Sequence, residues 1–230
     1  MTPAHPTGSR SPAGRYRARM LRKLALVVVL LGAPASASAA TITLTNPGTV
    51  SPPSCPANPC TALSRTTAIQ ASDGTDTSPF AITQPGRITS WSLTLAAPDK
   101  AQVHYFDAHE GGTAQAAIGV LRNLGGSSYE LVAESGVVHL QPWFGKTATI
   151  NLHHALRVKP GETVALIVPT WAPALALNYP SSTAWQASRA SGECNDITLQ
   201  TVQEIVGSRA TYACSYPSAQ VTYAATETTG

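Results

Sequence analysis

The chain has 230 residues and a formal net charge of +3, but its fifteen basic and twelve acidic groups are unevenly placed. Residues 1–40 carry six basic groups and no acid, which leaves nine basic and twelve acidic groups on residues 41–230. A mildly acidic body argues against nucleic-acid binding, because that needs a basic face. The 43% of hydrophobic residues argue against disorder, and the 12% of charged residues are too few for a coiled coil. We therefore expect one domain with an ordinary core.

Residues 1–40 have the pattern of a secretory signal peptide. Residues 24–31 form an apolar run that is too short to cross a bilayer comfortably, and a basic pair precedes it. Small residues in the spacing of a cleavage site follow at residues 35–39. The pattern predicts that residues 1–40 are removed and that the protein is secreted, with no membrane contact after cleavage. The stretch before Met20 is long for a signal peptide, and we hypothesise that Met20 is the true start.

The four cysteines are consistent with an oxidising destination. They are Cys55, Cys60, Cys194 and Cys214. Four cysteines allow three pairings, among which the sequence does not choose. A bridge between Cys55 and Cys60 is plausible because five residue steps with two prolines bring them together, and it would leave Cys194 and Cys214 to pair. Zinc is the weaker interpretation, because neither pair has C-x-x-C spacing.

The rest of the chain divides into an N-terminal segment and a region of strands. Residues 41–45 begin with a short β-rich run, but residues 41–85 as a whole are rich in Pro, Ser and Thr and are expected to be irregular. Residues 86–230 are expected to form the folded domain. Alternation of apolar and polar residues predicts strands at 88–95, 102–106, 116–123, 128–134, 137–140, 147–152, 163–168, 175–179, 183–187 and 218–226.

Three of these segments carry more specific predictions. Residues 116–134 have the glycine pair of a tight turn between two runs, which predicts a hairpin. Residues 163–168 are almost continuously apolar, which indicates a central strand covered on both faces. Residues 196–206 fit either a short helix or one arm of a hairpin with residues 209–216, and the Thr, Val and Ile content favours the hairpin. Short strands separated by Gly and Pro turns predict an all-β, antiparallel β-sandwich of the jelly-roll type.

Four stretches of this sequence together resemble a group of exported bacterial β-sandwich proteins that have no known activity. They are GRITSWSLTL at 86–95, IGVLR at 118–122, VKPGETVAL at 158–166 and PTWAP at 169–173. With the two late cysteines, the resemblance covers residues 80–226. It implies export and a sandwich fold, and it carries over no catalytic residue.

The densest cluster of metal-ligating side chains is His104, Asp107, His109 and Glu110. Imidazole and carboxylate groups are ligands of divalent metals, but a solvated loop explains this spacing more simply. Residues 73–77 resemble the start of a calcium loop but lack the later acidic ligands, so an Asx turn is the better interpretation and structural calcium is not supported. We expect no cofactor.

Tryptophans supply the candidate ligand-binding residues. Trp91 lies on the apolar face of a predicted strand and is expected in the core. Trp143, Trp171 and Trp185 follow turn-forming residues, and indoles held on loops can stack on sugar rings. The alternative is that Trp143 and Trp171 close the ends of the sandwich.

These observations predict an exported, non-catalytic binding module whose ligand is a polysaccharide or another cell-surface polymer. A surface protein that contacts other proteins is the first alternative. A hydrolase is the second, although the sequence has no catalytic motif. Its candidate acids are Asp107, Glu110, Glu130 and Glu134. The last two are four residues apart on one strand face, roughly 13 Å, which exceeds the separation that glycoside hydrolysis needs.

Overall fold

The computed structural model describes residues 39–47, 51–196 and 198–230, so the predicted signal peptide lies outside the described residues. The described residues form fourteen strands, one α-helix and one 3-10 turn. The strands are β1 (Ala40–Leu44), β2 (Leu63–Ser72), β3 (Gly86–Thr94), β4 (Gln115–Gly125), β5 (Ser128–Glu134), β6 (Val138–His139), β7 (Thr147–Val158), β8 (Glu162–Ala172), β9 (Leu175–Leu177), β10 (Ala184–Ala187), β11 (Arg209–Thr211), β12 (Cys214–Pro217), β13 (Ala219–Val221) and β14 (Tyr223–Thr229). The helix is α1 (Lys100–His109) and the 3-10 turn is η1 (Gln141–Trp143).

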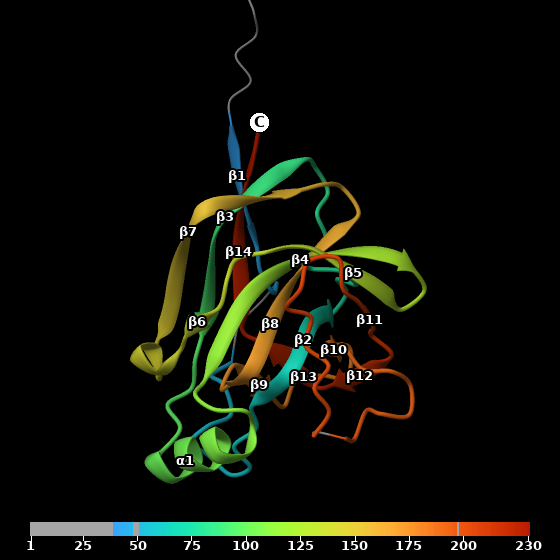
Figure 1. The fold of residues 1–230 in the computed structure, drawn as a ribbon. Helices are drawn as coiled ribbons and strands as arrows, with labels where there is room; N and C mark the ends of the chain where they lie inside the picture. Colours follow the sequence, from blue (N-terminus) through green and yellow to red (C-terminus); the bar gives the residue numbers. More distant parts are fainter. Residues whose placement is uncertain (1–38, 48–50, 197) are drawn as a thin grey trace, which may run out of the picture. The chain divides into compact units, whose positions relative to one another are not determined.

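Every strand pair in this part of the chain is antiparallel, which confirms the all-β prediction. The smaller sheet has the order β1-β14-β3-β7. The larger sheet has the order β11-β5-β4-β8-β2-β10-β12, with β6 paired to β4, and β9 and β13 form a separate pair. Figure 1 shows β3, β7 and β14 on the left and β2, β8 and β10 to their right. The arrangement is sandwich-like, and the jelly-roll connectivity stays a prediction.

The main core lies between the two sheets. Trp91 of β3, Ile118 of β4, Leu166 of β8 and Tyr223 of β14 belong to one buried cluster, and Trp91 is a core residue as predicted. The Tyr223 hydroxyl donates a hydrogen bond of 2.9 Å to the carbonyl of Val164, which ties the smaller sheet to β8. Burial of these large side chains is the main force that holds the sheets together.

Strand β8 is covered on both faces, as its apolar run predicts. Val164 and Leu166 face the main core, whereas Ala165 and Ile167 join a second buried cluster that also contains Tyr212. The hairpin of β4 and β5 is confirmed as well.

The interpretation of residues 41–85 as irregular is wrong for β2, which lies between β8 and β10 in the larger sheet. This strand buries threonines that the apolar pattern does not count. The Thr67 N–H donates to Ser188 Oγ at 2.9 Å, and the Gln203 N–H donates to Thr67 Oγ1 at 2.9 Å. Buried polar groups with partners therefore take the place of apolar residues.

The predicted strand at 102–106 is wrong, because these residues belong to α1. Asp99 is the N-cap: its carboxylate accepts from the Gln102 N–H at 2.9 Å, and the Gln102 side chain accepts from the Asp99 N–H at 2.9 Å. This reciprocal capping box fixes the first turn. The Asp99-x-x-Gln102 pattern is visible in the sequence, but the apolar alternation of the following residues favours a strand.

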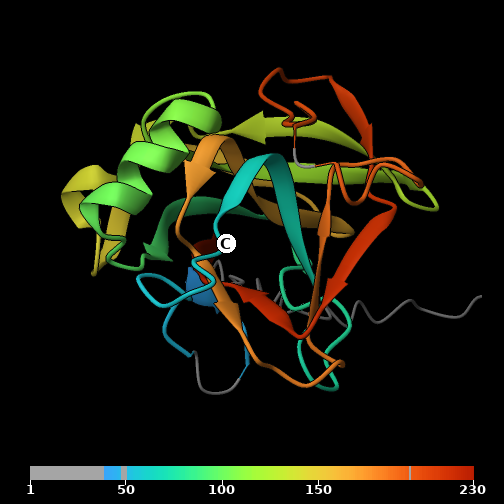
Figure 2. The same cartoon turned by 90° about the horizontal axis from the view of Figure 1, so that it is seen from below.

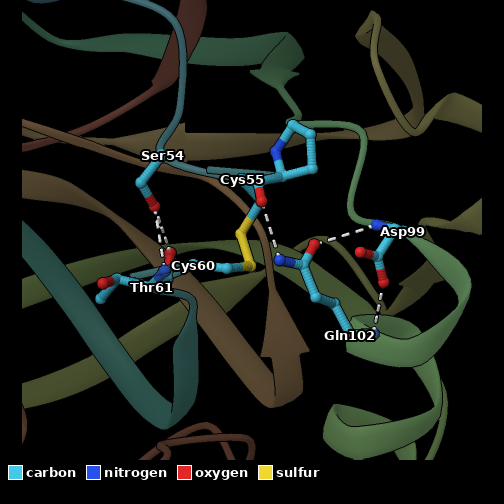
Figure 3. The surroundings of a disulfide bond; sticks show 7 residues. Ser54, Cys55, Cys60, Thr61, Asp99 and Gln102 are labelled. Carbon is cyan, nitrogen blue, oxygen red and sulfur yellow. Dashed lines mark hydrogen bonds between the residues drawn. A yellow bond between two sulfur atoms is a disulfide. The ribbon is translucent and has the colours of Figure 1, made fainter. Parts of the chain in front are cut away.

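The first disulfide joins Cys55 and Cys60 and lies beside the N-terminus of α1, as Figure 3 shows. The Gln102 side chain donates to the Pro56 carbonyl at 2.9 Å, which ties the disulfide loop to the helix. Ser54 Oγ accepts from the N–H of Thr61 at 3.0 Å, which closes the loop on its other side.

The second disulfide joins Cys194 and Cys214, so the structure has the pairing that the short Cys55–Cys60 spacing favours. Two disulfides are compatible with an extracellular location. None of the helices in the described residues is long and apolar enough to cross a membrane.

The predicted hairpin of residues 196–206 with 209–216 is wrong, and residues 198–206 are not helical either. β11 pairs with β5, and β12 pairs with β10. Residues 198–206 are instead hydrogen-bonded to β2, since the Thr201 N–H donates to the Arg65 carbonyl at 3.0 Å.

Candidate functional site

A cavity of about 290 Å³ lies beside the start of β2. The residues that line it come from β2, β9, β10, β12 and β13 and from the segments that precede β2 and follow β10. Figure 2 views this part of the fold from below, with the teal β2 between the orange strands β8 and β10. Strands from distant parts of the chain therefore bring the lining residues together. We call this cavity the Arg189 pocket.

The walls of the Arg189 pocket are mostly apolar. Leu63, Leu177 and Ala219 line it, together with Trp185 and Tyr216. The last two rings stack, with centroids 4.5 Å apart and 19° between their planes. Aliphatic and aromatic walls of this kind are typical of small-molecule sites.

Arg189 is the charged residue of the pocket, and it is only 5% exposed. Its Nη1 donates to the Tyr216 hydroxyl at 3.1 Å and its Nη2 donates to the Ser64 carbonyl at 3.4 Å. Both acceptors are neutral. None of the ion pairs between described residues includes Arg189, and its buried Nε has no hydrogen-bond partner.

The second disulfide holds the polar side of the pocket in place. The Tyr216 hydroxyl accepts from Arg189 and donates to the Cys194 carbonyl at 2.7 Å. Cys194 is bonded to Cys214, which pairs with Ala187 at the junction of β10 and β12. The guanidinium is thus positioned by a network that a covalent bond fixes at one end.

Trp185 is the one predicted binding residue that lines this pocket. It is buried, and its Nε1 has no hydrogen-bond partner among the described residues. Strand alternation places its neighbour Gln186 on the opposite face of β10. Gln186 lines a second, more polar pocket of about 220 Å³.

The sequence predicts that Trp171 lies on a turn, but in the structure it lies within β8. It is fully buried between the rings of Phe106 and Phe144. Its Nε1 donates to Asp107 Oδ1 at 2.9 Å and to the Gly112 carbonyl at 3.0 Å. Trp171 is therefore a core residue that α1 covers.

Trp143 lies in η1, is half-buried and packs against the main core. Since Trp171 and Trp185 are both buried, the three tryptophans form no exposed aromatic platform. The specific surface on which a sugar ring would stack in the sequence-based hypothesis is absent at these positions.

The predicted metal ligands are His104, Asp107, His109 and Glu110. They lie on or directly after α1, and both acids have other partners: Glu110 pairs with Arg65 at 3.0 Å, and Asp107 accepts from Trp171. Within the described ranges no group of three or more His, Cys, Asp or Glu side chains is placed to hold a metal ion. The metal-binding interpretation therefore has no geometric basis here.

The residues of the calcium-like motif form a turn. The backbone groups of Asp73 and Asp76 bond to each other, and Asp76 Oδ1 accepts from the Ser78 N–H at 2.9 Å, which is an Asx turn. The buried Asp73 carboxylate accepts from Thr183 Oγ1 and Gln220 Nε2, each at 2.9 Å.

The remaining acids proposed for a hydrolase also have structural partners. Glu130 pairs with Arg122 at 3.1 Å and with Arg209 at 3.8 Å. Glu134 accepts from the Gly136 N–H. Neither acid lines the Arg189 pocket.

Sequence reasoning missed Arg189 and Tyr216. The sequence does contain a pattern that could have indicated Arg189. In the predicted strand at 183–187, residues 185 and 187 share one face, and Arg189 is the next residue in the same alternation. A charged residue on a buried face indicates either a paired ion or a functional group. The predicted hairpin pairs Tyr216 with residues 196–206, whereas the structure pairs it with Trp185 of β10.

The second pocket presents amide and hydroxyl groups. Asn123, Tyr129, Thr163 and Gln186 are among its lining residues. The Tyr129 ring packs edge-on against Tyr212 with centroids 5.1 Å apart, which leaves it half-buried.

No known protein family, no curated protein and no solved structure matches this chain. The chemistry of the site is therefore derived from the chain's own residues.

Proposed function

We propose that the protein is an exported, non-catalytic binding module that takes a small, largely apolar ligand into the Arg189 pocket. The observation that carries this proposal is a cavity of about 290 Å³ with apolar and aromatic walls. If one water-sized group occupies about 30 Å³, the cavity has room for roughly ten non-hydrogen atoms. Burial of an apolar ligand there is favourable because it removes both surfaces from water.

The construction of the pocket supports binding rather than a reaction. Its lining residues include no His, Asp or Glu that would act as a general base, and the cysteine that lines it, Cys194, is held in a disulfide with Cys214. The walls come from paired strands, so the pocket is formed before the ligand arrives and little ordering entropy is lost on binding. The signal-peptide pattern of residues 1–40 and the two disulfides support export.

Isothermal titration of the purified protein with octan-1-ol tests the pocket, because this ligand is neutral and close to the expected size. We expect saturable binding to the wild type. Ala62 lines the pocket, so Ala62→Phe fills it and should weaken binding at least tenfold. Ala155→Phe is the matched control, since Ala155 is also half-buried but lies on β7. Equal binding by both variants, or none by the wild type, would refute the proposal.

Sequencing of the N-terminus of the secreted protein tests export separately. A mature chain that begins near residue 40 supports it. Retention of residues 24–31 in the purified protein would contradict it.

A glycan or cell-surface polymer is the second candidate ligand, and the polar pocket on the other face of β10 favours it. Its amide and hydroxyl groups match the hydroxyls of a sugar, and Tyr129 supplies one aromatic ring. Retention on chitin, cellulose or peptidoglycan that Tyr129→Ala abolishes would support this candidate. Tyr105→Ala serves as the control because Tyr105 is exposed on α1. Absence of retention on all three polymers would exclude the candidate for these polymers.

A further inference from the structure

We infer that the ligand of the Arg189 pocket is an organic monoanion: a carboxylate attached to a small apolar body, with Arg189 as its counterion. This inference rests on the proposed function and adds the chemical class of the ligand. It depends on the charge of the pocket rather than on its volume.

Arg189 is a buried cation whose partners are all neutral. A guanidinium has five N–H donors, and the hydrogen bonds to Tyr216 and Ser64 use two of them. The buried Nε–H has no acceptor. A charge removed from water without a counterion is unfavourable, whereas a carboxylate placed against the guanidinium compensates the charge and accepts two hydrogen bonds at once.

Arg65, a half-buried arginine on β2, shows what such compensation looks like in this protein. Arg65 pairs with the buried Glu110 at 3.0 Å. Arg189 is more deeply buried, yet no carboxylate of the described residues lies within ion-pair distance of it.

Two acids lie near Arg189 in the fold, but both are exposed and have other partners. Thr198 lowers the pKa of Asp196 through hydrogen bonds from its hydroxyl and its N–H, and Arg189 adds a weaker electrostatic contribution in the same direction. Glu193 accepts from the Ala190 N–H at 3.2 Å. Exposed carboxylates in water offset a buried charge only in part.

A second donor lies on the same pocket. Trp185 contributes an indole N–H that is buried and has no acceptor, and its ring forms part of the wall. One cation and one neutral donor suit the single charge and two oxygens of a carboxylate. The apolar remainder of the walls suits a hydrocarbon or aromatic body, and a dianionic phosphate would find only one positive charge.

Titration calorimetry with octanoate and octan-1-ol tests the inference, because the two ligands share a body and differ in charge. We expect the wild type to bind octanoate at least tenfold more tightly. Arg189→Gln should remove this difference, so that the affinities of this variant for octanoate and octan-1-ol become nearly equal. Arg87→Gln is the matched control, because Arg87 is exposed on β3, outside the pocket.

Trp185→Phe keeps one aromatic ring and removes the N–H donor together with the second ring, so it tests the inference even if Arg189→Gln fails to fold. We expect the ratio of octanoate affinity to octan-1-ol affinity to fall several-fold. Equal affinity of the wild type for both ligands would overturn the anion inference and leave the apolar pocket standing. Absence of binding by either ligand would overturn the proposed function as well.

Discussion

Trp171 and Trp185 are both buried, but their surroundings differ. Trp171 lies on β8, which pairs with the strand that carries Arg65, whereas Arg189 closely follows the strand of Trp185. In the α1 region, formed by α1 and the part of β8 that it covers, the Trp171 N–H has two acceptors and Arg65 is paired with Glu110. In the Arg189 pocket, the Trp185 N–H and the Arg189 Nε have none. In the first region the Trp171 ring packs against two phenylalanine rings and the arginine has a carboxylate partner. The second region contains a cavity, and the hydrogen-bond partners of its arginine are neutral. Buried polar groups are normally paired, so the unpaired donors around this cavity support the proposal that it binds a ligand.

The largest loss of stability should appear when one of the two indoles is removed. Trp171→Ala leaves a void under α1 and should lower the free energy of unfolding by about 4 kcal/mol. Trp185→Ala enlarges a cavity that already exists, and it should cost about half as much. Urea denaturation of both variants measures this, and equal losses would contradict the comparison.

Removal of a carboxylate near each arginine should affect the stability of the protein to different extents. Glu110→Gln removes the buried carboxylate charge that faces Arg65 and should destabilise the protein by about 3 kcal/mol. Asp196→Asn, beside Arg189, should change stability by less than about 0.5 kcal/mol because Asp196 is exposed. A large loss from Asp196→Asn would show that Arg189 already has its counterion within the chain.

The two disulfides belong one to each region and close loops of different length. The Cys194–Cys214 bridge spans twenty residue steps and the Cys55–Cys60 bridge spans five. In the chain-entropy model, removal of the Cys194–Cys214 bridge costs about 3 kcal/mol and removal of the Cys55–Cys60 bridge about 2 kcal/mol. Paired Cys→Ala variants measured by thermal unfolding test the order. Only loss of the Cys194–Cys214 bridge should also weaken octanoate binding, because Tyr216 bonds to the Cys194 carbonyl.

Glu227 lies outside both regions, and its substitution should have a smaller effect than loss of either disulfide. Its Oε1 is buried in the smaller sheet without a partner, and burial raises the pKa of its carboxyl. Because the pKa of Glu227 is higher in the folded than in the unfolded protein, its protonation favours folding, and this contribution is fully present below the ordinary glutamate pKa. That contribution is lost as the pH rises through the raised pKa of Glu227. Glu227→Gln should therefore be more stable than the wild type at pH 7, by about 1 kcal/mol, and should lose this advantage in acid. Denaturation at both pH values measures it, and a destabilised variant at pH 7 would contradict the assignment.

Strands with strong alternation or a continuous apolar run were predictable from local sequence, as β3, β4, β5 and β8 show. β2 was missed because its buried threonines are satisfied by Ser188 and Gln203, which are more than a hundred residues away. Residues 102–106 were assigned to a strand because alternation was weighed above the capping box that begins at Asp99. The segment 198–206 follows neither period because its backbone bonds to β2.

Local sequence pattern was enough to predict the all-β class, the central position of β8, the hairpin of β4 and β5 and the core position of Trp91. These features depend on residues close together in the chain, whose period or composition decides which face is buried. The three-dimensional arrangement of the strands makes Trp171 a core residue, gives Asp107 and Glu110 other partners, and brings Arg189, Trp185 and Tyr216 to one pocket. Those outcomes depend on which strands pair across distant parts of the chain, and local pattern carries no information about that choice of partner.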